Sequence, residues 1–136
     1  MELIEVKILN TTIDRVMNRQ MGELGLTSAQ SHVLVFLYLC KKDIVCQKDI
    51  EQALSLSHPT VSSILKRLEE KQMVITEAME EDRRFKSIRL SEKCNDINRQ
   101  LFEKVSAVYE QAVTGFSEEE LCRFSDFLKR MNDNLQ

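Results

Sequence analysis

The residues with the clearest chemical character lie in two short stretches of the chain. In residues 58–68, small hydroxyl side chains are followed one turn later by the cations Lys66 and Arg67. Small hydroxyls let a backbone approach base edges, while Lys and Arg donate hydrogen bonds to phosphates and to guanine. In residues 82–86, three cations fall within four positions. The two stretches together have the chemistry of a surface that binds a grooved polyanion such as duplex DNA.

Hydrophobic periodicity divides residues 58–68 into two faces. The positions that follow the i, i+3, i+4, i+7 spacing and must face the core are Val61, Ile64, Leu65 and Leu68. Ser57 suits the N-cap, and Pro59 falls in the first turn, where its missing N–H costs nothing. The other face and its flanks carry the residues that we expect to contact DNA: His58, Pro59, Thr60, Ser62, Ser63, Lys66 and Arg67. Taken alone, this helix fits an ordinary solvated surface equally well.

The next stretch predicts a two-stranded hairpin with a charged tip. The tip spans Glu80–Arg84, and the return strand spans Phe85–Leu90. Because a hairpin tip reaches away from the body, Arg84 can enter the minor groove, whose narrow A·T tracts attract arginine. Asp82 does not suit a DNA contact, and we expect it to orient a neighbouring arginine. The predicted wing residues are therefore Asp82, Arg83, Arg84 and Lys86, although solubility alone also explains a charged tip.

Two short helices and a ribbon must position these side chains. Residues 47–54 predict one helix, Ser55–Ser57 a tight turn, and Pro59–Lys71 a second helix ahead of the hairpin. Helix, turn, helix and charged ribbon is the order of a winged helix-turn-helix, in which one helix meets base edges and the ribbon meets the backbone or minor groove. We therefore expect a mainly α (α+β) fold with a two-stranded wing.

Amphipathic helices are predicted on the N-terminal side of this unit. An imperfect apolar stripe over residues 3–20 includes Ile4 and Ile8 and indicates a first helix. Thr27 and Gln30 fit a capping box that opens a second helix. The apolar residues of that helix, which we expect to be buried, are Val33, Leu34, Phe36, Leu37 and Cys40.

Two more helices are predicted on the C-terminal side. After Ser91, apolar residues recur every three or four positions until Gly115 ends the pattern. A capping box at Ser117 then opens a last helix, whose apolar seam is Leu121, Phe124, Leu128, Met131 and Leu135. Such a seam packs lengthwise on another helix, either within the chain or in a second copy. We expect a two-fold dimer with N- and C-terminal dimerisation helices, because dimers place two recognition helices about 34 Å apart.

Length and charge define the class of protein. The chain has 136 residues, enough for one domain with a core, and no apolar run nears the ~18–20 residues of a membrane span. Met1–Glu5 lacks the pattern of a signal peptide, so we expect a cytoplasmic protein without a membrane partner. The net charge of −3 argues against a nucleic-acid partner. Residues 41–89 carry ten Lys and Arg against nine Asp and Glu, so the excess acid lies outside the candidate unit.

The order and spacing of several motifs resemble the MarR family, dimeric winged-helix transcription factors of bacteria and archaea. The resemblance covers nearly the whole chain. Its most specific part is Asp82-Arg83-Arg84, which fits the D-x-R signature of the family's wing. The other matching motifs are Leu26–Gln30, Gln47–Ile50, Leu54–Ser57, Thr60–Ser62, Leu68–Lys71 and Ile88–Ser91.

The resemblance implies a single MarR-like domain over residues 1–136. It implies a DNA-binding lobe over about residues 27–90 and dimerisation helices over about 1–22 and 92–136. It also implies a homodimer that binds a pseudo-palindromic operator in double-stranded DNA, usually as a repressor. Many members release DNA when a small, often aromatic anion binds between the dimer helices and the DNA-binding lobe. Others respond to thiol oxidation or zinc, and the ligand residues of this chain stay unknown at this stage.

Three features depart from the family pattern. Gln72 stands where Gly commonly ends the recognition helix, and a non-Gly residue in a left-handed cap costs roughly 1 kcal/mol, so we expect this helix to end differently. Cys94 replaces another common Gly. The first helix lacks the cysteine of the family's peroxide sensors, and two distant His residues do not suit its zinc sensors.

The four cysteines leave one alternative function open. Cys40, Cys46, Cys94 and Cys122 show neither a CxxC pair nor zinc spacing. We expect reduced thiols that pack as small hydrophobic side chains, with a thiol-based redox response as the alternative. A winged-helix module that binds protein is a further alternative. No nucleophile–base pair, phosphate-cradling Gly loop or isolated carboxylate pair is present, so we expect neither an enzyme nor a cofactor or metal site.

Overall fold

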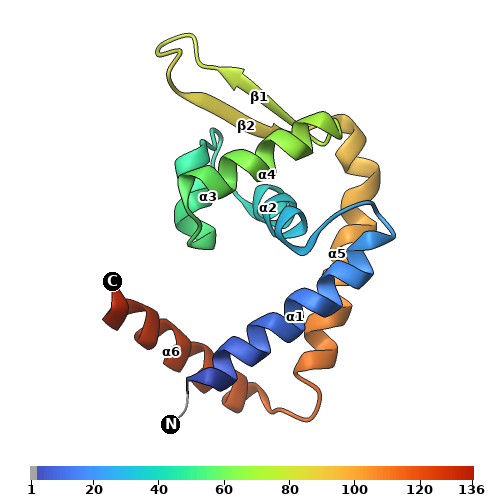
Figure 1. Ribbon diagram of the computed structural model, residues 1–136, viewed down its shortest axis with the longest axis vertical. Helices are drawn as coiled ribbons and strands as arrows, with labels where there is room; N and C mark the ends of the chain where they lie inside the picture. The colour runs from blue at the N-terminus through green and yellow to red at the C-terminus, as the bar shows by residue number, and fades with distance from the viewer. Residues whose placement is uncertain (1–2) are drawn as a thin grey trace.

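The computed structural model describes residues 3–136, which form six α-helices and one two-stranded antiparallel sheet. In chain order the elements are α1 (Ile4–Gly22), α2 (Ser28–Leu39), α3 (Gln47–Leu54), α4 (His58–Glu70), β1 (Val74–Ala78), β2 (Lys86–Leu90), α5 (Glu92–Ala112) and α6 (Glu118–Leu135). The mainly α winged helix-turn-helix predicted from the sequence is confirmed. Helices α2, α3 and α4 and the wing β1–β2 gather in one half of the molecule, and α1, α5 and α6 form the other (Figure 1).

Polar caps determine where the helices begin. Thr27 Oγ1 accepts a hydrogen bond from the Gln30 N–H, and Gln30 Oε1 accepts one from the Thr27 N–H, both at 3.2 Å. Ser117 and Glu120 make the same exchange at the start of α6, at 3.2 and 2.8 Å. These contacts satisfy N–H groups that have no partner within the helix. Both predicted capping boxes are therefore confirmed.

The core of the first half lies where α2, α3, α4 and the wing meet. Its buried side chains include Val33, Leu34, Ile50, Val61, Leu68, Val74 and Ile88. The wing pairs Val74 with Leu90 at its base and Ala78 with Lys86 near its tip. The Ile88 N–H also donates to the Val45 carbonyl oxygen at 2.7 Å, which ties β2 to the segment before α3. The wing is therefore held to the helix-turn-helix by backbone hydrogen bonding as well as by apolar packing.

Helices α1 and α6 bury far less of their apolar surface than α2, α3 and α4 do. Helices α1 and α5 pack on each other through buried side chains such as Met17 and Leu101. Helix α6 buries none of its residues. The exposed large apolar side chains of α1 and α6 include Ile4, Val6, Ile8, Leu9, Phe124, Phe127 and Leu135. Among residues 3–136, no helix has both the length and the apolar character that a membrane crossing requires.

The structure corrects two sequence expectations, one about burial and one about the boundary of a strand. Of the five residues expected to be buried in and just after α2, Phe36, Leu37 and Cys40 are only half-buried, because they pack at the edge of the core. In α1 the buried positions are Met17 and Met21, near its C-terminal end. The return strand is also one residue shorter than predicted, since β2 begins at Lys86.

The end of α4 corrects a third expectation. Gln72 adopts φ 60°, the left-handed conformation usually taken by glycine. The Met73 N–H donates to the Leu68 carbonyl oxygen at 2.9 Å, which satisfies a carbonyl at the helix end. The recognition helix therefore ends in the usual left-handed way despite the non-glycine residue, and the expectation of a different ending is wrong.

Candidate nucleic-acid interface

The turn between α3 and α4 sets the direction of the recognition helix. Ser55 ends α3 in the left-handed conformation, with φ 53°. Ser57 is the N-cap of α4, where its Oγ accepts from the Thr60 N–H at 3.4 Å and lies 2.8 Å from Thr60 Oγ1. Pro59 follows in the first turn, as predicted. The turn is short and polar, so the first residues of α4 are presented to solvent.

Burial on α4 follows the two predicted faces. The buried residues are Val61, Ile64, Leu65 and Leu68. Ser62 is half-buried, and the other helix residues predicted to contact DNA are exposed: His58, Pro59, Thr60, Ser63, Lys66 and Arg67. The outer surface of α4 thus presents an imidazole and hydroxyls first and two cations later.

At the wing tip, Asp82 orients Arg84 through three hydrogen bonds. Asp82 Oδ1 accepts from the Arg84 backbone N–H at 3.0 Å and from Nε at 3.1 Å, and Oδ2 accepts from Nη2 at 3.0 Å. These bonds from Arg84 hold the pKa of Asp82 below its ordinary value. The Arg84 side chain is nevertheless 88% exposed, and Arg83 and Lys86 beside it are also exposed. The structure therefore contains the orienting contact predicted for Asp82.

A cleft of about 360 Å³ lies between the recognition helix and the wing. Its lining residues are Cys46, Gln47, Lys48, His58, Ser62, Arg84, Phe85 and Lys86. The cleft brings together members of both predicted stretches, whereas the other predicted residues of α4 lie outside it: Pro59, Thr60, Ser63, Lys66 and Arg67. Three lining side chains are cations and none is an acid, which is the charge that favours a phosphate.

The cleft also contains four residues outside the predicted set of DNA contacts, namely Cys46, Gln47, Lys48 and Phe85. Gln47 Nε2 lies within hydrogen-bonding distance of both His58 and Ser62. Ser62 is fifteen positions further along the chain, so no helical periodicity indicates the contact. Lys48 had a sequence signal, since it is a cation at the start of the supporting helix.

Known proteins show the same architecture. A family model described as MarR family matches residues 24–84. The transcriptional regulator SlyA matches with a TM-score of 0.88 and 26% identity, over 98% of this chain and 92% of that chain. S. aureus MepR in its DNA-binding conformation matches with a TM-score of 0.86 and 26% identity, over 98% and 97% of the two chains. Residues 24–84 therefore resemble the MarR family. The crystal structure of the S. aureus MepR–DNA complex also matches this chain in fold, with a TM-score of 0.90 and 24% identity over 98% of each.

The four thiols of the chain differ in their exposure to solvent. Cys94 is buried, its Sγ donates to Asn98 Oδ1 at 3.3 Å, and burial raises the pKa of its thiol. Cys40 and Cys46 are half-buried, and Cys122 is exposed on α6. Within residues 3–136, no three His, Cys, Asp or Glu side chains are grouped so as to hold a metal ion.

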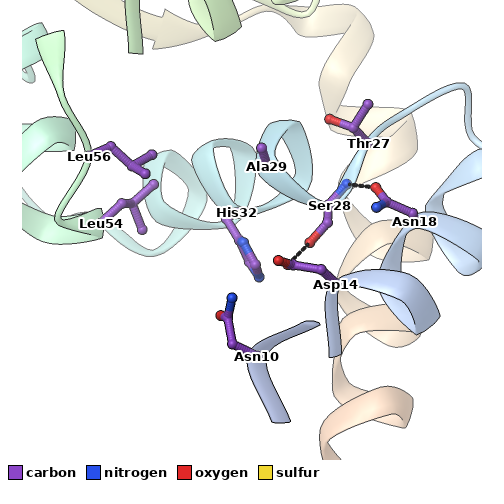
Figure 2. A pocket seen from close by; sticks show the side chains of 9 residues that line it. All are labelled: Asn10, Asp14, Asn18, Thr27, Ser28, Ala29, His32, Leu54 and Leu56. Atoms are coloured by element: carbon purple, nitrogen blue, oxygen red, sulfur yellow. Dashed lines mark hydrogen bonds between the residues drawn. The ribbon is translucent and has the colours of Figure 1, made fainter. Parts of the chain in front are cut away.

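A second cavity, of about 550 Å³, lies between α1, the start of α2 and the turn before α4 (Figure 2). Its lining residues are Asn10, Asp14, Asn18, Thr27, Ser28, Ala29, His32, Leu54 and Leu56. One wall of the cavity is polar, and Ser28 links its residues by two hydrogen bonds. The Ser28 Oγ donates to Asp14 Oδ1 at 3.0 Å, and the Ser28 N–H donates to Asn18 Oδ1 at 2.7 Å. Leu54 and Leu56 form the apolar wall, and burial lowers the pKa of His32 between the two walls despite the nearby Asp14.

Proposed function

We propose that this protein is a sequence-specific DNA-binding regulator of transcription in the MarR family. The cleft between α4 and the wing carries the proposal, because it joins the polar start of α4 to Arg84 and Lys86 with no intervening acid. In this arrangement α4 enters the major groove, and Arg84 reaches the backbone or the minor groove. Two similar structures, S. aureus MepR and a Listeria monocytogenes regulator with a 26mer, are described as DNA complexes, which supports the proposal.

The salt dependence of binding tests this function. A duplex recovered by selection from random DNA is titrated at several salt concentrations with wild type, Arg84→Ala and Lys66→Ala. Each substitution should lower affinity and reduce the slope of log K against log salt by up to ~0.9 if it removes one phosphate contact. Arg123→Ala is the control, since Arg123 lies on α6 and already pairs with Glu119 at 2.7 Å. Salt-independent binding would overturn the proposal and favour a protein-binding winged helix.

We further propose that the protein acts as a homodimer and represses transcription from a pseudo-palindromic operator. The support is the exposed apolar surface of α1 and α6, which a single copy leaves in contact with water. Pairing through these helices would place two recognition helices on successive turns of one face of the duplex. A repressor of this design needs a signal that makes both copies release DNA together.

We infer that the signal is a small molecule that binds the cavity of Figure 2. Leu56 in its wall adjoins Ser57, the N-cap of the recognition helix, so a ligand between Leu56 and α1 would shift the start of α4. Asp14 is the acidic residue of the lining, and the lining has neither Lys nor Arg. Burial also favours the neutral form of His32. This lining favours a cationic or neutral hydrogen-bond donor over the aromatic anion that the family resemblance implies.

A thiol-based response is the second candidate, and the position of Cys46 favours it. Cys46 lines the cleft between α4 and the wing, beside Lys48 and Arg84. An added oxygen or adduct on its sulfur would occupy space in that cleft. Cys46→Ser should then abolish the effect of oxidant on DNA affinity, whereas Cys94→Ser at the buried thiol should preserve it. An unchanged response in Cys46→Ser would exclude this sensor.

A further inference from the structure

Four polar side chains join the supporting helix α3 to the recognition helix α4. Gln47 and Glu51 lie one turn apart on α3, and His58 and Ser62 lie one turn apart on α4. Gln47 Nε2 lies 2.8 Å from Ser62 Oγ, 3.1 Å from the His58 carbonyl oxygen and 3.0 Å from His58 Nδ1. His58 Nδ1 also lies 3.1 Å from Glu51 Oε2. The contacts form one connected network at the start of both helices.

Counting hydrogens gives each contact a direction. A carbonyl oxygen only accepts, so the Gln47 atom that faces the His58 carbonyl must be the amide nitrogen. That nitrogen has two hydrogens for three neighbours. A carboxylate oxygen also only accepts, so His58 Nδ1 must carry a hydrogen to bond Glu51. The two amide hydrogens therefore go to the His58 carbonyl oxygen and to Ser62 Oγ.

This assignment biases Ser62 toward donating, because Gln47 already uses one of the two acceptor lone pairs of the hydroxyl. Its hydroxyl oxygen accepts from Gln47 and retains one hydrogen, which is donated to no group within residues 3–136. Ser62 lines the cleft between α4 and the wing. Its hydrogen is therefore available to an acceptor that enters this cleft.

We propose that Gln47 biases Ser62 toward donating a hydrogen bond to DNA and thereby favours acceptor groups among the DNA groups that Ser62 binds. The inference rests on the proposed DNA binding. In the major groove the partner would be guanine N7 or O6, adenine N7 or thymine O4, because cytosine presents only a donor there. A phosphate oxygen is the other source of the same acceptor chemistry. Both amide hydrogens of Gln47 are donated within the protein, so in this proposal Gln47 acts as a positioning residue.

The test compares wild type with Gln47→Leu, Gln47→Glu, Ser62→Ala and the double variant Gln47→Leu with Ser62→Ala. Gln52→Leu is the matched control, since Gln52 is an exposed glutamine on the same helix. Each protein selects sequences from random DNA, and its affinity for the wild-type consensus duplex is measured. Gln47→Leu and Ser62→Ala should each weaken binding roughly fivefold per half-site, the effect of one neutral hydrogen bond. Gln52→Leu should bind as wild type does.

Gln47→Glu reverses the polarity while nearly keeping the shape. A carboxylate offers Ser62 only acceptors, so the hydroxyl hydrogen turns inward and its lone pairs face the DNA. Where the partner is a base, cytosine should then become tolerated at one position of each half-site. Where the partner is a phosphate, Gln47→Leu should weaken binding equally on all sequences. Either pattern supports the donor polarity and identifies its partner.

The double variant separates positioning from structural support. If Gln47 acts through Ser62, Gln47→Leu costs no further affinity once Ser62 is Ala. An equal loss in both backgrounds, or wild-type affinity and consensus in Gln47→Leu, overturns the proposal. A wild-type protein that enriches no sequence would instead overturn the DNA-binding function, and this inference with it.

Discussion

Individual side chains at the candidate interface take their direction from partner side chains. Arg84 lies at a hairpin tip, where a long side chain loses considerable conformational entropy on binding. Three hydrogen bonds to Asp82 remove part of that cost in advance. Gln47 does the same for Ser62 with one bond. The interface is therefore prepared for binding by residues that need not touch DNA themselves.

Asp82→Asn tests whether Asp82 orients Arg84 for binding, because the two possible explanations predict opposite changes in DNA affinity. Removing an acid near DNA raises affinity if only long-range charge matters. Losing the orienting carboxylate should instead lower affinity roughly tenfold, as for one lost charge-assisted hydrogen bond. Glu81→Gln, at the neighbouring exposed acid, should leave affinity unchanged or raise it. Fluorescence anisotropy with a fixed duplex measures both, and a rise in Asp82→Asn would contradict the orienting role.

Asp49 gives the protein an acid-sensitive contribution to stability. Its bonds from Lys42 and from the Cys46 N–H lower its pKa from 3.8 to about 2. Because the pKa is lower in the folded state, the stabilisation is present above pH 4 and is lost as the pH falls toward 2. Asp49→Ala should reduce the free energy of unfolding by about 1 kcal/mol at pH 7, as for other lost caps. Urea titrations should show a smaller deficit in the free energy of unfolding of Asp49→Ala at pH 2.5 than at pH 7. Asp43→Ala should show no deficit at either pH.

At the scale of elements, the end of α4 carries a local conformational cost. Gln72 at φ 60° is disfavoured by roughly 1 kcal/mol relative to glycine. Gln72→Gly should therefore raise the free energy of unfolding by about 0.5 to 1 kcal/mol. The same substitution at Gln52, within α3, should lower it by about 1 kcal/mol. In thermal denaturation, a higher melting temperature for Gln72→Gly and a lower one for Gln52→Gly would support this account. A lower melting temperature for both variants would contradict it.

The structural features that could be predicted from the sequence are those that depend on residues close together in the chain. The capping boxes at Thr27 and Ser117 and the core face of α4 follow from spacings of three and four, and all are present. What it missed joins distant segments. The contact from Gln47 to Ser62 and that from Lys71 Nζ to Gln30 Oε1, at 2.8 Å, bridge different helices. No periodic pattern encodes such pairs, because their separation depends on how the elements pack.

The cavity beside α1 can be tested with two probes of similar shape and opposite charge. Benzamidine is cationic and benzoate is anionic at neutral pH. Calorimetry should show benzamidine binding to wild type, with affinity lost in Asp14→Asn. Asn18→Asp, which adds a second acid to the same wall, should strengthen it. Tighter binding of benzoate than of benzamidine would contradict the charge argument and restore the anionic effector.

At the scale of the whole molecule, α6 points to a second chain. Phe127 is 54% exposed on a helix with no buried residue. If α6 pairs with another copy, Phe127→Asp should raise the dimer dissociation constant by roughly 30-fold or more, as for a central aromatic at an interface. Phe85→Asp, at an equally exposed phenylalanine on the wing, should leave it unchanged. Sedimentation equilibrium measures both, and a wild-type monomer at micromolar concentration would refute the pairing.

If α6 pairs with a second copy as proposed, its apolar surface also makes the number of molecules in a cell a regulatory quantity. When folding and pairing are linked, the melting temperature rises with protein concentration, because each dilution releases subunits that expose this surface. Dilution by cell growth would then reduce the number of paired subunits faster than the number of chains. Operator occupancy would respond more steeply than linearly to expression level, so the helix that buries nothing on its own would set the dose at which regulation begins.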